Sequence, residues 1–246
     1  MDRSLYIAMS GAKQIMQAQA INSNNLANAN TIGFRADLAA FRSQPVFGAG
    51  EPTRVFAMAE RAGVDVTPGQ TNATGRDLDI AIRGEGWIAV QAPDGSEAYT
   101  RAGNLNLKEG GILKTGNGLP VLGNGGPIAV PQAEKIEIGA DGTISVRGIG
   151  QPANTLSVLD RIKLVNPEPG QLVKGTDGLM RMRDGSAAAP DAKVNIVSGA
   201  LETSNVNTIE AMVNMIALAR QFEQQMKMMK SVEETDRSST QLMSLG

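Results

Sequence analysis

Helix-breaking residues are distributed very unevenly along this chain of 246 residues. All eleven prolines lie between residues 45 and 190, and fifteen of the 28 glycines lie between residues 84 and 150. Residues 1–32 hold one glycine, and residues 200–245 hold neither glycine nor proline. Since proline breaks the hydrogen bonding of a helix and glycine weakens it, the two ends suit long uninterrupted helices. The distribution predicts a helix at each end and strands between them.

Apolar residues at both ends repeat at helical spacing. The N-terminal stripe advances by three and four residues in turn and becomes polar after Ile15, whereas the C-terminal stripe stays apolar throughout. Heptad stripes of this kind pack in coiled coils. The predicted helix-packing residues are Leu5, Ala8, Ala12, Ile15, Met212, Met215, Ala219, Phe222, Met226 and Met229.

The C-terminal helix is expected to run from about residue 207 to residue 244, a length of ~57 Å at about 1.5 Å per residue. Asn207 followed by Glu210 resembles a capping box, and Glu223 with Lys227 and Glu233 with Arg237 are favourable pairs one turn apart. With no third helix predicted, the two helices cover only part of each other's apolar surface. We therefore expect a partner chain to cover the remainder and the ends of the free subunit to stay disordered until assembly. The alternative is an ordinary, self-contained helical bundle.

The middle of the chain switches to a period of two. Residues 77–83 alternate polar and apolar side chains, and residues 87–91 and 97–101 flank a Pro-Asp-Gly turn, which predicts a hairpin. The expected fold class is α+β, with long N- and C-terminal helices pairing as a coiled coil and a central β-rich, mostly antiparallel domain.

Four stretches of the chain follow from these patterns. The first is an N-terminal helix ending in an asparagine-rich segment, the second an extended connector, the third a β-rich domain, and the fourth a C-terminal helix that pairs with the first. Their predicted bounds are 1–35, 36–75, 76–200 and 201–246.

Composition excludes several classes of function. The chain has 23 basic and 25 acidic residues, so it has no cationic excess for a phosphate backbone, and nucleic acid is not an expected partner. It has no histidine and no cysteine, which removes Ser-His-Asp and Cys-His nucleophiles and the usual zinc sites. We expect no enzyme activity, catalytic residue, metal, cofactor or small-molecule substrate.

Neither a membrane span nor a cleaved signal peptide is expected. Residues 14–34 carry no charge, but three glutamines and five asparagines make them too polar to span a bilayer. Lys13 and Gln14 interrupt the apolar run that a signal peptide would need.

Two weak motifs have simpler interpretations. The segment from Gly84 to Ala89 has the spacing of a dinucleotide fingerprint but leads into a strand, so its glycines are expected at a strand corner. Asp77 and Asp79 could act as a carboxylate pair in a hydrolase, but their alternation with apolar residues places them on the solvent-facing side of a strand.

Residues 22–30 contain five asparagines, which are poor in a helix interior but suited to ending a helix and binding backbone groups. An asparagine-rich flexible loop is the alternative. Gly33 can supply a positive φ, and Leu26 and Phe34 can anchor the segment.

This segment resembles the N-terminal signature of the flagellar rod and hook axial proteins. Residues 199–207 and 215–223 resemble the C-terminal signature of that family, and residues 77–86 and 99–103 resemble its shared strand domain. The signature residues are Asn24, Asn25, Leu26, Ala27, Asn28, Thr31, Gly33, Phe34, Arg35, Leu201, Glu202, Ser204, Asn205 and Val206.

The resemblance implies a structural subunit of the proximal rod of the flagellar basal body, polymerising through its terminal helices into the drive shaft that crosses the periplasm. A distal rod protein G or another rod or hook axial protein is the alternative. The implied partners are neighbouring copies, other proximal and distal rod subunits and the flagellar type III export apparatus. A secreted adhesin or phage-tail-like spike would share the architecture without needing both terminal signatures.

Overall fold

The computed structural model describes residues 4–45, 55–108, 110–152 and 155–244. The chain forms two compact units. We call the first, which holds both long helices, the helical unit, and the second the strand unit. The helical unit consists of residues 1–29, 37–63 and 206–246, and the strand unit consists of residues 30–36 and 64–205. The predicted bounds of the four stretches stay a prediction.

Two helices form at the ends of the chain, as the distribution of helix breakers predicts. They are α1 (Ser4–Ala27) and α2 (Thr208–Ser244). The side-chain oxygen of Asn207 accepts hydrogen bonds from the backbone N–H groups of Ile209 and Glu210 at 3.1 and 3.2 Å, which confirms the predicted N-cap. Among the described residues, neither helix combines the length and the apolarity of a membrane span.

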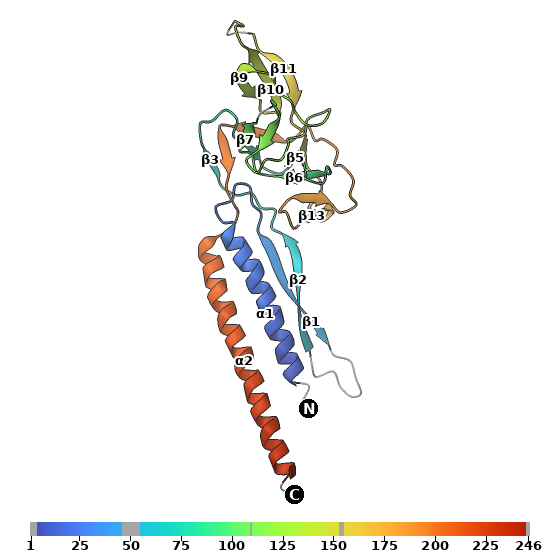
Figure 1. Ribbon diagram of the computed structural model, residues 1–246, viewed down its shortest axis with the longest axis vertical. Helices are drawn as coiled ribbons and strands as arrows, with labels where there is room; N and C mark the ends of the chain where they lie inside the picture. The colour runs from blue at the N-terminus through green and yellow to red at the C-terminus, as the bar shows by residue number, and fades with distance from the viewer. Residues whose placement is uncertain (1–3, 46–54, 109, 153–154, 245–246) are drawn as a thin grey trace. The chain divides into compact units, whose positions relative to one another are not determined.

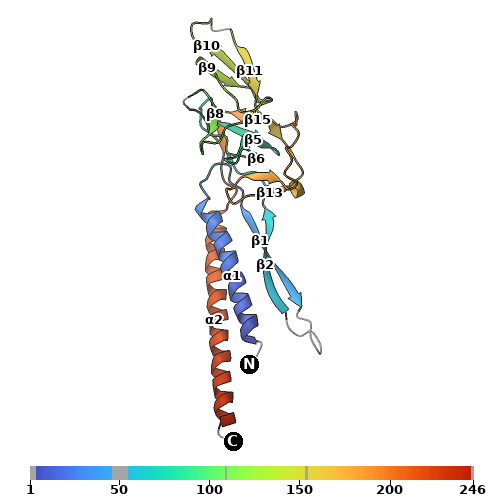
Figure 2. The ribbon, with the colours of Figure 1, turned by 45° about the vertical axis from the view of Figure 1, so that its right-hand side comes forward.

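The two helices lie side by side and run antiparallel (Figures 1 and 2). Near one end, the Asn22 amide donates to the backbone oxygen of Ala211 at 2.7 Å. Farther along, a Cβ added at Gly11 would lie 3.3 Å from the side chain of Gln225. If the same pairing of positions continues to Ser4, where the described part of α1 begins, about a dozen residues of α2 extend past that point. At about 1.5 Å per residue they are roughly 18 Å long.

The predicted coiled coil is wrong. Interlocking helices need large apolar side chains at facing positions, whereas the buried face of α1 is mostly small. Leu5, Met212 and Met226, which the heptad stripes placed at the contact, are 41%, 54% and 47% exposed. The buried side chains of α1 are Ala8, Ala12, Ile15 and Ala18. On α2, the inward positions are Ala211, Met215, Leu218, Phe222, Gln225, Met229 and Val232.

A two-stranded hairpin lies beside α1 in the part of the chain expected as an extended connector (Figure 1). It consists of β1 (Asp37–Pro45) and β2 (Val55–Val64), and Asp37 is the one residue of β1 that is buried. Leu38 and Phe41 are exposed. Pro52 lies outside the described residues. Hydrogen bonds between the side-chain amide of Asn25 and the backbone of Asp37 join the start of the hairpin to α1.

The strand unit is built from short strands and one 3₁₀ turn. They are β3 (Thr71–Ala73), β4 (Ile80–Arg83), β5 (Trp87–Gln91), β6 (Glu97–Thr100), β7 (Leu105–Leu107), β8 (Leu113–Thr115), β9 (Ala133–Ile138), β10 (Thr143–Gly148), β11 (Ser157–Arg161), β12 (Leu164–Val165), η1 (Pro169–Gln171), β13 (Leu172–Lys174), β14 (Met180–Met182), β15 (Asn195–Ser198) and β16 (Ala200–Glu202).

Strand pairing is antiparallel in every register that the structure describes. One sheet has five strands in the order β12-β5-β6-β14-β13, and another has three in the order β11-β10-β9. β15 pairs with β4, β16 with β3 and β7 with β8. The predicted hairpin is confirmed as β5 and β6, and the glycines at 84 and 86 lie at the corner before β5.

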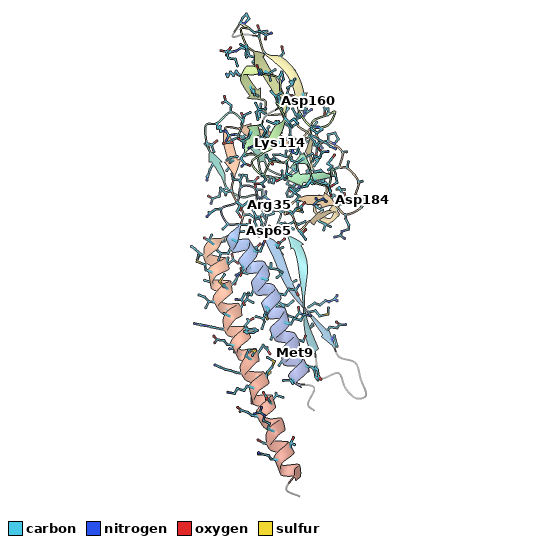
Figure 3. The ribbon with its side chains drawn as sticks, in the orientation of Figure 1. Met9, Arg35, Asp65, Lys114, Asp160 and Asp184 are labelled. Atoms are coloured by element: carbon cyan, nitrogen blue, oxygen red, sulfur yellow. The ribbon has the colours of Figure 1, made fainter. Side chains whose placement is uncertain are left out.

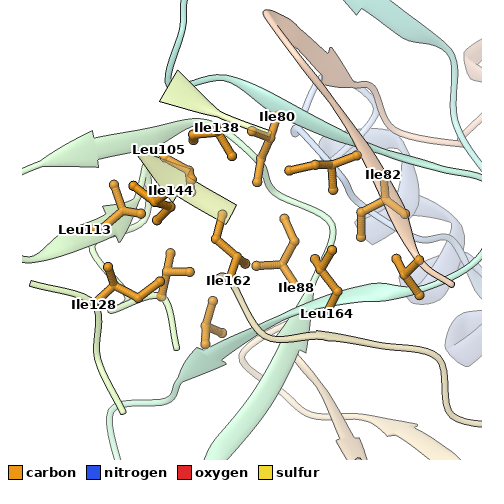
Figure 4. Close-up of a cluster of buried hydrophobic side chains, with 14 of the residues drawn as sticks. Ile80, Ile82, Ile88, Leu105, Leu113, Ile128, Ile138, Ile144, Ile162 and Leu164 are labelled. Carbon is orange, nitrogen blue, oxygen red and sulfur yellow. The ribbon is translucent and has the colours of Figure 1, made fainter. Parts of the chain in front are cut away.

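β5 is covered on both faces, which explains why its sequence is apolar without alternation. Ile88 and Val90 belong to the larger core cluster, whereas Trp87 and Ala89 belong to a second cluster with Tyr99. Figure 4 shows the isoleucine and leucine side chains of the larger cluster meeting between strands from distant parts of the sequence. Aliphatic residues fill this core, as the low aromatic content of 3% requires.

Tyr99 is a buried tyrosine whose ionisation at alkaline pH would destabilise the strand unit. Its hydroxyl donates to Glu97 at 2.9 Å and accepts from the backbone N–H of Ala188 at 2.7 Å. Burial raises the pKa of Tyr99 from 10.0 to about 12, and the bonded, negatively charged Glu97 adds to the shift.

We predict that stability is lost as the pH rises from about 10 to about 12, because the unfolded phenol ionises first and the folded phenol retains its proton. The full effect is roughly 2–3 kcal/mol. Urea unfolding followed by circular dichroism at several pH values measures it, and Tyr99→Phe should remove this part of the pH slope. An unchanged slope in Tyr99→Phe contradicts the assignment.

Candidate functional site

The asparagine-rich segment ends α1 and binds backbone groups. The backbone N–H of Asn28 donates to the carbonyl oxygens of Asn24 and Asn25 at 3.2 and 3.1 Å, and its side-chain amide donates to Asn24 at 2.9 Å. The amide of Asn25 accepts from the N–H of Asp37 at 2.9 Å and donates to its carbonyl oxygen at 2.8 Å. These bonds satisfy backbone groups that the end of a helix leaves without partners. The segment is therefore a structured helix end and not a flexible loop.

Within the strand unit, Gly33 allows its turn to lie close against the backbone at Arg101. Its φ is +67°, and a Cβ added there would lie 2.3 Å from the backbone carbon of Arg101. Its N–H donates to the backbone oxygen of Glu202 at 2.9 Å. A side chain at this position would meet backbone atoms that cannot move aside, so the close contact requires glycine.

A buried carboxylate, that of Glu202, lies between two guanidinium groups. Arg35 pairs with one of its oxygens and Arg101 with the other, the second at 2.9 Å. All three side chains are at most 2% exposed. The backbone N–H of Gly69 adds a hydrogen bond to Glu202 at 2.8 Å. Figure 3 marks Arg35 within the strand unit. We call Arg35, Arg101, Glu202 and the neighbouring Trp87 the Glu202 cluster.

Trp87 offsets part of the excess positive charge in the cluster. The guanidinium carbons of Arg35 and Arg101 lie 5.8 and 5.4 Å from the centre of its ring, which is within the range of cation–π attraction. In the described part of the chain, Nε and Nη1 of Arg35 and Nε of Arg101 have no hydrogen-bond partner. The Trp87 ring is therefore the neighbour of these guanidinium groups on the side where no oxygen atom accepts a hydrogen bond.

Burial lowers the pKa of the Arg101 guanidinium, and the positive charge of Arg35 lowers it further, whereas Glu202 opposes both effects. A guanidinium still stays charged near neutral pH because its ordinary pKa is far above 7. Arg101 also donates to the carbonyl oxygen of Gly84 at 2.8 Å, which fixes the corner before β5.

Asn205 connects three backbone segments of the strand unit. Its side-chain oxygen accepts from the N–H of Ala36 at 2.8 Å, and its amide nitrogen donates to the carbonyl oxygens of Asp65 and Thr67 at 3.0 and 3.1 Å. Lys174 secures the same region, since its ammonium donates to the carbonyl oxygen of Arg35 at 2.7 Å and lies 4.0 Å from the centre of the Phe34 ring. The side chains of Asn205 and Lys174 therefore connect backbone segments that are distant in the sequence.

The other signature residues differ in exposure. Asn24, Ala27 and Thr31 are exposed, Ser204 is buried, and Leu26, Phe34, Leu201 and Val206 are half-buried. Of the predicted helix-packing set, Ala8, Ala12 and Ile15 are buried, Met215, Ala219, Phe222 and Met229 are half-buried, and Leu5, Met212 and Met226 are exposed. Assembly roles for these residues stay a prediction.

Sequence reasoning did not single out Arg101, Trp87 or Gly69 as members of one site. The available signal for Arg101 was a charged residue at the end of a predicted strand that holds Ala98 and Tyr99, because a cation beside buried residues needs a buried partner or solvent. The residues near Arg101 in the sequence do not identify its partner, because Glu202 lies 101 positions away.

The carboxylate pair considered in the sequence does not form. Asp77 is exposed in a turn, whereas Asp79 is buried, accepts from the Thr74 hydroxyl at 2.8 Å and lies 3.6 Å from Arg76. The expectation that both face solvent from one strand was wrong, because β4 begins only at Ile80. Among the described residues, no group of three or more carboxylates lies close enough to hold a metal ion.

Three known protein families match separate parts of the chain. They are "Flagella basal body rod protein" at residues 5–35, "Flagellar hook protein FlgE/F/G D1 domain" at residues 81–146, and "Flagellar basal body rod FlgEFG protein C-terminal" at residues 197–242. Arg35, Arg101 and Glu202 each come from a different one of these segments. The Glu202 cluster thus joins all three.

Whole-chain similarity agrees with these matches. The chain is 46% identical to the flagellar basal-body rod protein FlgF of Salmonella typhimurium and 45% identical to that of Escherichia coli, in both cases over 100% of each chain. It is 31% identical to the flagellar basal-body rod protein FlgG of Bacillus subtilis, over 94% of this chain and 96% of the relative.

We predict that Glu202→Gln lowers the free energy of unfolding of the strand unit by about 3–5 kcal/mol, because it leaves two buried guanidinium groups without a carboxylate. Urea unfolding followed by circular dichroism and by the fluorescence of Trp87, the one tryptophan of the chain, measures the change.

Glu134→Gln is the matched control. The Glu134 side chain is 56% exposed and lies 3.5 Å from Arg147, so its loss should cost at most about 1 kcal/mol. Equal losses in the two variants would show that the Glu202 cluster contributes no more than a surface ion pair.

Proposed function

Because the chain belongs to the family of flagellar basal-body rod proteins, we propose that it is a structural subunit of the rod in a bacterial flagellum. Proteins of this family are structural and lie in the flagellar basal body. The observation that carries the proposal is the match to FlgF over the full length of both chains at 46% identity. The joining of all three family segments in the Glu202 cluster supports it.

The relatives favour a subunit of the FlgF type over one of the FlgG type. Identity to FlgF from two bacteria is 46% and 45% over the entire chain, against 31% to FlgG of Bacillus subtilis. We propose a place in the proximal part of the rod. A distal subunit of the FlgG type is the second candidate.

Polymerisation through the terminal helices is the proposed way of assembly. Both helices expose large apolar side chains, among them Tyr6, Met9 and Met16 on α1 and Ile209 and Ile216 on α2. A hydrophobic surface of this kind is costly in a free subunit and suits contacts with other chains. The proposed partners are neighbouring copies and other proximal and distal rod subunits.

Export without a cleaved signal, through the flagellar type III apparatus into the periplasmic rod, completes the proposal. The absence of cysteine supports it, since no disulfide can form that would block passage of an unfolded chain through a narrow channel. The contact between α1 and α2 consists mainly of small side chains and includes the hydrogen bond from Asn22 to Ala211. A contact of this kind suits helices that become ordered only when the subunit assembles.

We predict that Phe222→Asp prevents incorporation into the rod and abolishes motility. Phe222 is half-buried on the face of α2 that meets α1, so a carboxylate there would be desolvated without a partner. Swimming in soft agar and immunoblots of isolated basal bodies measure the effect.

The matched control is Gln221→Asp, which places the same charge at an exposed neighbouring position. The strand unit of both variants should stay folded, with an unchanged Trp87 emission spectrum. Normal motility in Phe222→Asp would contradict assembly through the terminal helices.

The order of assembly distinguishes a proximal from a distal subunit. If the chain is proximal, basal bodies from cells that lack it should contain no subunit of the FlgG type. Immunoblots of purified basal bodies test this. Recovery of that subunit at the level found in unmodified cells would overturn the proximal placement and favour the distal one.

A further inference from the structure

An apolar groove with a volume of about 930 Å³ lies where α2 continues beyond the described start of α1. Leu5, Met226, Met229 and Val232 contribute its apolar lining. α1 forms one side only at Leu5, so the groove is open along the last turns of α2. Its lining therefore includes apolar surface that the described part of this chain covers incompletely, since Met229 and Val232 are half-buried and Leu5 and Met226 are exposed.

Two lysines give the groove a local positive charge. Lys227 and Lys230 line it beside the methionines, and neither makes an ion pair with any residue that the structure describes. The predicted pair of Glu223 with Lys227 was therefore wrong, whereas that of Glu233 with Arg237 is confirmed. Glu233, the acidic side chain of the lining, is already paired with Arg237 at 2.6 Å. An occupant that carries a carboxylate would supply the missing partner for the lysines.

The other end of α2 presents a stripe with the complementary features. Ile209, Met212, Val213 and Ile216 are 75%, 54%, 60% and 56% exposed. Their spacing of i, i+3, i+4 and i+7 is that of an amphipathic helix that anchors in a hydrophobic groove. Glu210 flanks this stripe and forms no ion pair within the described residues. We call the four apolar residues the α2 stripe.

We propose that the groove of one subunit receives the α2 stripe of a second copy, with Glu210 of that copy beside Lys227 and Lys230. This inference rests on the proposed function, in which copies of the chain are neighbours in the rod. It specifies which surfaces of the two copies meet.

Charge excludes the other exposed stripe of the helical unit as the occupant. Tyr6, Met9 and Met16 of α1 are also exposed, but Lys13 lies among them on the same side of the helix. Placing Lys13 next to Lys227 and Lys230 would bring like charges together, which is unfavourable in an interface. Glu210, which flanks the α2 stripe, carries the opposite charge.

The pairing is heterologous, because the groove and the stripe are different surfaces of one subunit. Such contacts repeat from copy to copy with one polarity, and they build an open assembly when each copy is displaced along the axis so that no ring closes. With parallel copies, Glu210 lies 17 positions before Lys227 and 20 before Lys230 along the helix. At about 1.5 Å per residue, neighbouring copies are displaced by about 25–30 Å along α2.

Disulfide cross-linking in basal bodies tests the contact, since the chain has no cysteine of its own. In a chain with both Met212→Cys and Met229→Cys, the two sulfurs are about 25 Å apart along one helix. A disulfide needs Cα atoms within about 7 Å, so the bond can form only between copies. Oxidation of basal bodies should then give a ladder of covalent multimers on a gel without reductant.

The matched control combines Met16→Cys with Met229→Cys, and no ladder is expected from it. A ladder from this control and none from the first pair would overturn the proposal in favour of the α1 stripe. No ladder from either pair, with the variant chains present in basal bodies, would overturn it as well.

Charge reversal provides a second test that needs no cysteine. Glu210→Lys alone, or Lys227→Glu with Lys230→Glu, should reduce the number of copies per basal body about tenfold, and the triple variant should restore it to within about twofold. Lys193→Glu, an exposed change in the strand unit, is the control and should have no effect. Failure of the triple variant to restore incorporation contradicts the pairing.

These outcomes separate the two proposals. If the unmodified chain is absent from isolated basal bodies, the proposed function fails. If it is present but shows neither the cross-link nor the charge rescue, only the pairing of groove and stripe fails.

Discussion

The carboxylate of Glu202 is the interaction on which the architecture of the strand unit depends. It accepts from Arg35, Arg101 and the backbone of Gly69, and the side chains of this ion triad are almost completely shielded from water. A buried charge is tolerated only when partners replace its hydration. The four residues come from the N-terminal segment, the middle of the chain and the C-terminal segment. The cluster can therefore form only after these parts have come together.

This constraint gives the segments around the cluster their structure. Gly33 is needed because backbone atoms of Arg101 lie where a Cβ would be. Trp87 places its ring beside two cations, and the side chain of Asn205 makes hydrogen bonds with three backbone groups, those of Ala36, Asp65 and Thr67. The terminal signatures thus have a structural role within the strand unit in addition to any role in assembly.

The helical unit follows a different physical rule. α1 buries mainly alanine against its neighbours, and α2 extends past it. Small side chains let helices approach closely but leave much of the apolar surface of a long helix exposed. A rod subunit needs such surface for its neighbours, whereas an isolated globular protein would have to cover it. The apolar surface left exposed on the helical unit agrees with the proposed assembly through the terminal helices.

Local patterns in the sequence determined the helices at both ends, the N-cap at Asn207 and the hairpin of β5 and β6, because helix breakers and side-chain periodicity act over a few residues. They also carried the family resemblance. Only the tertiary structure decided which face of α2 turns inward, since apolar residues occur on several of its faces and the small residues of α1 select among them. It alone paired Arg35 with Glu202 across 167 positions, because a buried charge shows in the sequence without any sign of its partner.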